Sequence, residues 1–139
     1  MIILDTNVVS EVLRPTPEPT VLKWLEQQPA SSIFTTAVTE GEILYGIRLL
    51  PEGNRRTKLW TAAEEIFGAD FEGRVLSFDS EAAIHYAEIG SSRRTAGRPI
   101  SQFDAIIAAI TRSHGAALAT RNVRDFEGCG IEVLNPWNE

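Results

Sequence analysis

Short apolar runs alternate with longer amphipathic segments along the whole chain, and this alternation leaves few folds open to it. The longer segments carry apolar residues at helical spacing, whereas the short runs have the length of buried strands. Parallel strands need a crossover between them, which a helix usually provides. We therefore predict an α/β fold with a mainly parallel central sheet of about five strands flanked by helices. The predicted strands are residues 1–4, 32–35, 75–78, 117–119 and 131–134.

Prolines and polar capping residues set the expected limits of the helices. Pro15 and Pro29 close the first two helices. Either Thr36 or Thr39 can cap the third, because both precede its apolar residues. The last two helices are expected to begin after the caps Asp79 and Ser101.

The size and composition of the chain fit one soluble domain covering residues 1–139. Hydrophobic residues make up 43% and charged residues 23%, as in an ordinary globular protein. The single cysteine, Cys129, excludes an internal disulfide and a zinc site made of several thiolates. We see no apolar run long enough for a signal peptide or a membrane span, so we expect a cytoplasmic protein without membrane association.

An acidic residue directly follows the first predicted strand. Asp5 comes after four apolar residues, where a carboxylate is costly unless a cation or hydrogen-bond donors meet it. In parallel α/β folds, ligands bind beyond the carboxyl ends of the strands, which is where Asp5 is expected. The alternative is that Asp5 serves only as the N-cap of the helix that follows.

Two further acids, Glu42 and Asp104, are expected near the starts of helices. Thr39-x-x-Glu42 fits a capping box and Ser101-x-x-Asp104 nearly does, so spacing alone suits a structural role as well as a functional one. Both helix starts are expected beside the strand end that carries Asp5. Three carboxylates gathered there would repel one another without a divalent cation. An oxygen-only ligand set suits magnesium or manganese rather than zinc.

Polar residues also follow the fourth predicted strand. Thr120, Asn122 and Asp125 are expected at the same edge of the sheet as Asp5. Asn122 can ligate a cation through its amide oxygen or position a water, and Asp125 can either join the acids or cap a local turn. The fourth polar position of the site is therefore open between these two residues.

Taken in order, these residues resemble the motifs of PIN-domain ribonucleases over nearly the whole chain. The motifs that carry the resemblance are Ile3-Leu4-Asp5-Thr6-Asn7, Thr39-x-x-Glu42-x-x-x-Gly46, Asp104-Ala105-Ile106-Ile107-Ala108-Ala109 and Ala119-Thr120-Arg121-Asn122-x-x-Asp125-Phe126. Residues 7–15 and the ending Asn135-Pro136-Trp137 are most similar to the VapC/FitB branch, the toxins of bacterial toxin–antitoxin pairs.

The resemblance implies a single PIN-like nuclease domain that cuts RNA with Mg²⁺ or Mn²⁺. It also implies a homodimer and a small antitoxin partner of the VapB or FitA type, with DNA reached only through that antitoxin. The implied core acids and metal ligands are Asp5, Glu42 and Asp104. Asn122 or Asp125 would complete the catalytic set, and Thr6 and Thr120 would be supporting polar groups.

The net charge of −6 is unusual for a protein that binds nucleic acid, because such proteins commonly have a basic face. The four acids of the predicted site account for much of it and leave about −2 for the rest of the chain. Arg93, Arg94 and Arg98 are candidate contacts for RNA phosphates. The alternative is that they are cations placed favourably at the end of a helix.

Other functions fit the sequence less well. Receiver and phosphohydrolase domains need a lysine late in the chain, and the only lysines are Lys23 and Lys58. Histidine-driven ribonuclease chemistry needs two neighbouring histidines, and nothing in their spacing brings His85 and His114 together. The remaining alternative is a catalytically weak toxin that acts as half of a DNA-binding autorepressor complex. The acids favour the enzyme, and Asn122 favours the binding module.

Overall fold

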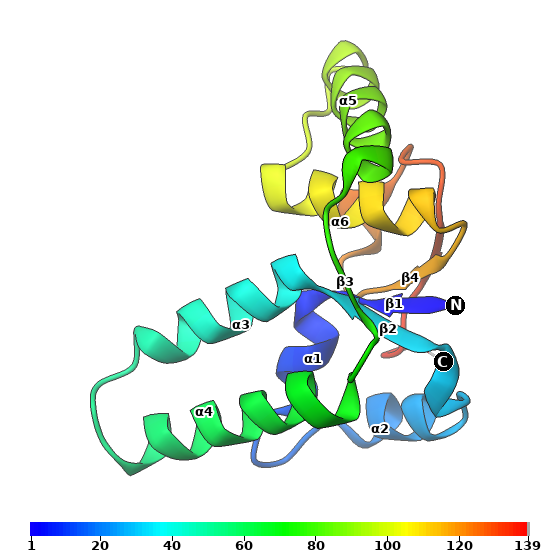
Figure 1. Ribbon diagram of the computed structural model, residues 1–139. Helices are drawn as coiled ribbons and strands as arrows, with labels where there is room; N and C mark the ends of the chain where they lie inside the picture. The colour runs from blue at the N-terminus through cyan, green and yellow to red at the C-terminus, as the bar shows by residue number, and fades with distance from the viewer. Residues whose placement is uncertain (139) are drawn as a thin grey trace.

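The computed structural model describes residues 1–138 and has a five-stranded sheet between two layers of helices (Figure 1). All neighbouring strands pair in parallel, in the order β3-β2-β1-β4-β5. The prediction of a parallel sheet of about five strands is confirmed. The strands are β1 (Ile2–Leu4), β2 (Ile33–Thr36), β3 (Val75–Leu76), β4 (Ala117–Ala119) and β5 (Glu132–Leu134).

Helices form the connections between the first four strands. Between β1 and β2 lie α1 (Thr6–Val12), α2 (Pro19–Glu26) and the short turn η1 (Ala30–Ser32). Between β2 and β3 lie α3 (Ala37–Arg48), α4 (Asn54–Glu65) and a π-helical turn, η2 (Ile66–Asp70). Between β3 and β4 lie α5 (Ser80–Thr95) and α6 (Gln102–Ser113), and η3 (Val123–Phe126) precedes β5. In residues 1–138, no helix has the length and apolar character needed to cross a membrane.

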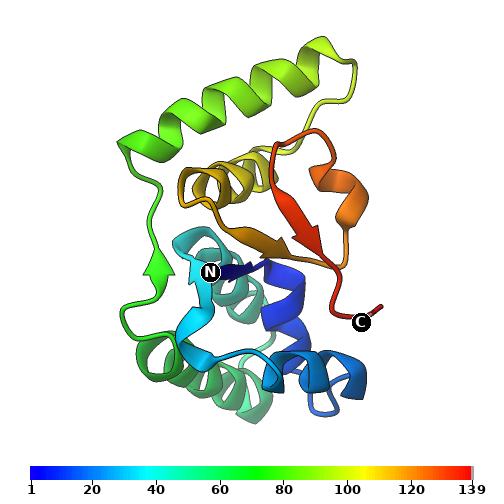
Figure 2. The same cartoon turned by 90° about the vertical axis from the view of Figure 1, so that its right-hand side faces the viewer.

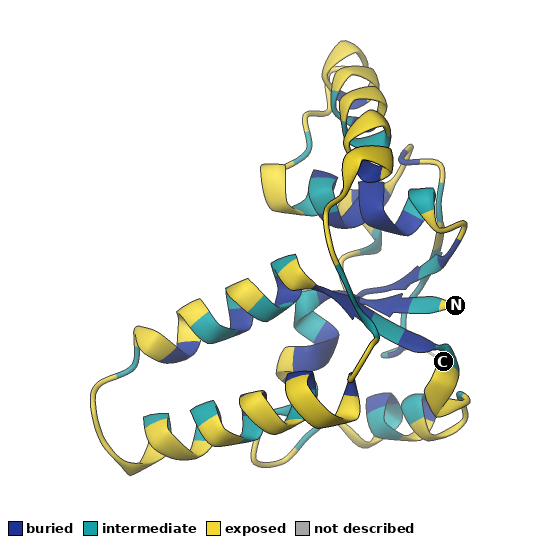
Figure 3. Cartoon of the chain, in the orientation of Figure 1, coloured by how far each residue is buried: buried dark blue, intermediate teal, exposed yellow. Residues whose placement is uncertain are grey.

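Each face of the sheet has its own hydrophobic core, because successive side chains of a strand point to opposite faces. Leu4 and Ala119 belong to the core shared with α1, α2, α3 and α4, which also contains Trp24. Ile3 and Leu118 belong to the core shared with α5 and α6. Figure 2 shows α5 and α6 on one side of the sheet and the earlier helices on the other, and Figure 3 shows the buried residues gathered between the layers.

The start of α3 differs from one of the predicted interpretations. Thr36 is the N-cap, and its hydroxyl oxygen accepts a hydrogen bond from the backbone N–H of Thr39 at 3.1 Å. The capping-box interpretation of Thr39 and Glu42 is therefore wrong. Because the helix begins three residues earlier, Thr39 lies fully buried in the first turn and Glu42 lies in the second. The caps Asp79 and Ser101 are confirmed.

The third strand is shorter than predicted. β3 covers two residues at the edge of the sheet, and Phe78, predicted to lie in the strand, is outside it and 42% exposed. An edge strand has one partner, here β2, so the ladder ends where that partner turns into α3.

Candidate active site

The carboxyl ends of β1, β2 and β4 meet at one edge of the sheet, where a cleft of about 500 Å³ opens. Asp5 directly follows β1, and Glu42 lies in the second turn of α3, which follows β2. Asp104 lies in the first turn of α6. Since α6 leads back into β4, its N-terminus reaches the edge where β4 ends. The three predicted acids therefore line one cleft, although they are far apart in the sequence.

Asp5 is the most enclosed acid of the cleft, with 4% of its surface exposed. Its Oδ1 accepts a hydrogen bond from the backbone N–H of Thr6 at 2.9 Å, so Asp5 is indeed the N-cap of α1. Its Oδ2 accepts hydrogen bonds from the Thr120 hydroxyl at 2.8 Å and from the Asn7 amide at 3.3 Å. Three donors, two from α1 and one from the residue after β4, thus fix the orientation of this carboxylate.

The capping role does not exclude a role in the cleft, because other acids act on Asp5. Burial raises the pKa of Asp5 to about 6, and the hydrogen bonds from Thr120 and Thr6 partly oppose that rise. The negative charges of Asp104 and Glu42 raise the pKa further. The electrostatic fields of Asp104 and Glu42 therefore both reach the Asp5 carboxylate.

Glu42 is held by a hydroxyl from the start of α1. The Thr6 hydroxyl donates a hydrogen bond to Glu42 Oε1 at 2.7 Å and lies 3.1 Å from the hydroxyl of Thr39. Thr39 is fully buried, so its contact with Thr6 helps to hold the Thr6 hydroxyl in place for Glu42. The predicted supporting residue Thr6 contacts Glu42, as Thr120 contacts Asp5.

Asp104 is half-buried, and its backbone N–H donates to the capping hydroxyl of Ser101 at 3.2 Å. Burial raises the pKa of Asp104, and the charge of Asp125 adds to that rise. Asp125 is therefore within electrostatic range of Asp104, but it is Asn122 that lines the cleft. The backbone N–H of Asn122 donates to the Thr120 hydroxyl at 3.1 Å. Both candidates for the fourth position thus lie near the acids.

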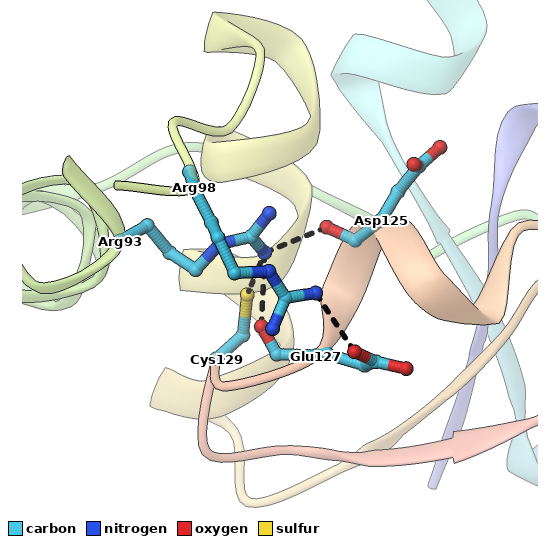
Figure 4. Close-up of polar contacts among 5 residues, drawn as sticks. All are labelled: Arg93, Arg98, Asp125, Glu127 and Cys129. Carbon is cyan, nitrogen blue, oxygen red and sulfur yellow. Dashed lines mark hydrogen bonds and ion pairs between the residues drawn. The ribbon is translucent and has the colours of Figure 1, made fainter. Parts of the chain in front are cut away.

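Arg93 holds together the segment that follows β4 (Figure 4). Its Nε donates to the carbonyl of Arg98 at 2.7 Å, and its Nη1 donates to the carbonyls of Asp125 and Glu127 at 2.8 and 2.9 Å. The same nitrogen lies 3.6 Å from the Sγ of Cys129. Arg93 is 7% exposed. The expectation that Arg93 contacts RNA phosphates is therefore wrong, because its guanidinium is buried and bonded to backbone carbonyls.

The other two candidate RNA contacts lie outside the lining of the cleft. Arg98 forms an ion pair with Glu127 at 2.7 Å on the surface, which lowers the pKa of Glu127. Arg94 is exposed in the last turn of α5, where a cation interacts favourably with the helix end. The alternative interpretation as helix-end cations therefore describes the placement of Arg93 and Arg94.

Several residues of the cleft were not among the predicted site residues. These are Asn7, Ser10, Glu11, Arg14, Arg121 and Trp137. Asn7 is the most connected of them, since its amide nitrogen donates to Asp5 and to Thr120. Asparagine is a poor helix former, so its position two residues after the strand-end acid is a sequence signal for a role in orienting that acid.

The cleft suits a hard divalent cation that keeps part of its water shell. Its candidate ligands are carboxylate and amide oxygens, which magnesium and manganese prefer. Burial raises the pKa of Asp5 and of Asp104, and neighbouring acids add to the rise, so a bound cation would favour their ionised forms. Within residues 1–138, no three acidic or other metal-binding side chains are close enough to form a ready-made site. Magnesium commonly uses one or two carboxylates and several waters, so the looser arrangement fits it.

Comparison with known proteins identifies the family. The family model described as PIN domain matches residues 2–128. The chain belongs to the PIN domain family. This PIN domain is 37% identical over 137 residues to the VapC ribonuclease Y4jK of Sinorhizobium fredii, covering 99% of this chain and 98% of that protein. It is 37% identical over 139 residues to the toxin FitB of Neisseria gonorrhoeae, covering 100% of both.

The structural comparison agrees with the sequence comparison. The structure of FitAB bound to the IR36 DNA fragment matches this PIN domain with a TM-score of 0.92 and 38% identity, covering 99% of this chain and 96% of the matched chain. The predicted resemblance to the VapC/FitB branch and to the PIN fold is confirmed.

Proposed function

We propose that this PIN domain is a magnesium- or manganese-dependent endoribonuclease and the toxin half of a bacterial toxin–antitoxin pair. The observation that carries the proposal is the convergence of Asp5, Glu42 and Asp104 on one cleft at the carboxyl edge of the sheet. The relatives support it, because one is named a VapC ribonuclease and another a toxin.

Asp5, Glu42 and Asp104 would hold the metal, with Asn122 or Asp125 as the fourth polar group. When bound, the metal neutralises the carboxylates, polarises a phosphate oxygen and lowers the pKa of a bound water. The hydrogen bonds from Thr6 and Thr120 keep two of the acids oriented before the substrate arrives. Such preorganisation removes a reorganisation cost at the moment of reaction.

One of the acids also accepts the proton of the attacking water. A carboxylate of the cleft orients the water and accepts its proton while the water attacks the phosphorus in line. The expected products carry 5′-phosphate and 3′-hydroxyl ends. Since the pKa of Asp5 is about 6, its ionised form predominates at neutral pH and above.

A second groove supports the antitoxin part of the proposal. It measures about 780 Å³ and lies between α1, α3 and α4, beside the acids. It shares Thr6, Ser10, Arg14 and Glu42 with the catalytic cleft, so an antitoxin segment bound in it can cover the acids. Its apolar lining consists of Leu13, Pro15, Ile43, Ile47, Leu50, Leu59 and Ala62.

The assembly is part of the same proposal. We propose a VapB- or FitA-like antitoxin as partner, a homodimer of this chain, and contact with DNA only through the antitoxin. The DNA-bound FitAB structure supports the association with DNA, since a chain similar to this one is part of that complex.

The test is cleavage of a mixed cellular RNA pool by the purified, antitoxin-free protein. Magnesium, manganese and EDTA are compared side by side. Metal-dependent cutting at a few sites supports the ribonuclease and reveals its substrate. The second candidate function is the catalytically weak half of an autorepressor complex, which Asn122 favours because it stands where a further acid would strengthen the metal site. Folded protein that cuts nothing under any metal would favour that function.

A further inference from the structure

An arginine and a tryptophan form a cation–π pair on the wall of the cleft that holds the acids. The guanidinium carbon Cζ of Arg121 lies 5.1 Å from the ring centroid of Trp137. Both residues line the cleft together with Asp5 and Asn122. The proposed hydrolysis assigns no role to either residue.

The backbone of Arg121 is linked to Asp5 through Asn7. The backbone N–H of Arg121 donates to the Oδ1 of Asn7 at 3.1 Å, and the amide of Asn7 donates to Asp5 at 3.3 Å. The backbone N–H of Trp137 donates to Asn135 Oδ1 at 3.0 Å, and the side chain packs against the core of α1, α2, α3 and α4. The pair is therefore a supported surface beside Asp5.

The charge of Arg121 is available to a ligand. Arg121 is exposed, and within residues 1–138 its guanidinium forms neither an ion pair nor a hydrogen bond with another side chain. The other arginine of the cleft, Arg14, differs: its Nη1 bonds both carboxylate oxygens of the buried Glu11, at 3.0 and 3.2 Å. Of the two cations in the lining, Arg121 is the one without an acidic partner.

We propose that Arg121, supported by Trp137, is a stacking subsite for an unpaired base of the RNA, next to the phosphate that the acids attack. Unpaired bases stack on aromatic rings and on guanidinium planes, whereas bases inside a duplex are already stacked and do not reach such a surface. The subsite rests on the proposed ribonuclease function and specifies its substrate class, which is a single-stranded region of RNA.

The test measures RNA binding rather than cutting. Every protein carries Asp104→Asn so that bound RNA stays intact, and each variant is checked for folding by thermal unfolding. The probes are a fluorescent, unstructured oligoribonucleotide of roughly 12 nucleotides and its duplex with a complementary strand. Binding is measured by fluorescence anisotropy with magnesium present.

We expect Arg121→Ala and Arg121→Lys each to weaken binding of the single strand about tenfold, the scale for losing one stacked base. Binding of the duplex should change less than about twofold. Lysine keeps the charge but lacks the planar surface, so it separates stacking from phosphate contact. Trp137→Phe keeps a ring beneath Arg121 and should retain most of the affinity. The matched control is Arg124→Ala, an exposed arginine outside the cleft lining with the same loss of charge.

Four results would overturn the subsite. If Arg121→Lys binds the single strand as tightly as the parent does, Arg121 contacts a phosphate and does not stack on a base. An equal loss for duplex and single strand would mean the same. A variant that binds RNA normally but loses the antitoxin would assign the pair to the protein partner. If the parent protein binds neither RNA, the proposed ribonuclease function fails together with the subsite.

Discussion

At the level of a single residue, Asp5 is placed where its negative charge is costly. It is buried where β1 ends and caps α1, yet it faces the negative charges of Asp104 and Glu42. Its pKa of about 6, against 3.8 for an unperturbed aspartate, means that ionising Asp5 costs the folded chain about 3 kcal/mol more than it costs the unfolded chain. A bound cation would offset this cost.

This conflict predicts a pH dependence of stability. Between about pH 4 and pH 6 the folded state retains the Asp5 proton while the unfolded state loses it, so Asp5 makes stability fall as pH rises through that window and keeps it lower above. Asp5→Asn should therefore gain stability relative to the parent as pH rises from about 4 to about 8. The measurement is urea unfolding in EDTA at both values. A difference between the two proteins that stays constant with pH would contradict the account.

Removing the Arg93 side chain should destabilise the protein, although Arg93 does not line the cleft. Arg93→Ala leaves three backbone carbonyls without their charged donor, so we expect the free energy of unfolding to fall by about 2–4 kcal/mol. Arg94→Ala is the matched control, since Arg94 is the exposed neighbour in the same helical turn and should change stability by less than about 0.5 kcal/mol. Urea unfolding compares the two variants. An equal loss of stability in both would contradict the structural role of the Arg93 hydrogen bonds.

At the level of elements, the sequence predicted the starts of helices well, but it did not predict contacts between residues far apart in the chain. Asp79 and Ser101 were identifiable because a cap bonds the backbone of its own helix. Thr36 and Thr39 could not be separated, because both precede the same apolar face and the choice depends on where β2 ends. The role of Arg93 was missed because two of its three carbonyl partners lie more than thirty residues further along the chain.

The groove between α1, α3 and α4 gives a prediction about the antitoxin. Leu50→Asp places a charge in the apolar lining, so we expect affinity for the cognate antitoxin to fall at least about tenfold. RNA cutting by the free toxin should stay nearly unchanged, since Leu50 is outside the catalytic cleft. Isothermal titration calorimetry and an RNA cleavage assay measure the two effects.

The neighbouring leucine provides the control for that experiment. Leu49 is 68% exposed and lies outside the groove lining, so Leu49→Asp adds the same charge without entering the groove. If both variants bind the antitoxin as tightly as the parent does, the antitoxin occupies another surface.

For the whole molecule, the fold explains how a chain with a net charge of −6 would serve the proposed ribonuclease function. The parallel topology gathers acids from residues 5, 42 and 104 into one cleft, where cations can neutralise them. The sequence sufficed to predict this grouping, because each acid adjoins a strand end or a helix start at the same edge. It could not predict how closely the side chains approach, nor that Arg121 and not Arg98 would line the cleft, because both depend on the packing of loops.

The central claim is that the gathered acids carry catalysis. The most direct measurement is the cleavage rate of one RNA substrate, in magnesium or manganese, by the parent protein, Asp104→Asn and Glu64→Gln. Glu64 is an exposed acid of α4 outside the cleft, so it controls for the loss of one charge. The account predicts that Asp104→Asn lowers the rate at least ~100-fold with its fold intact, while Glu64→Gln cuts like the parent. A folded Asp104→Asn protein that cuts at the parent rate would contradict it.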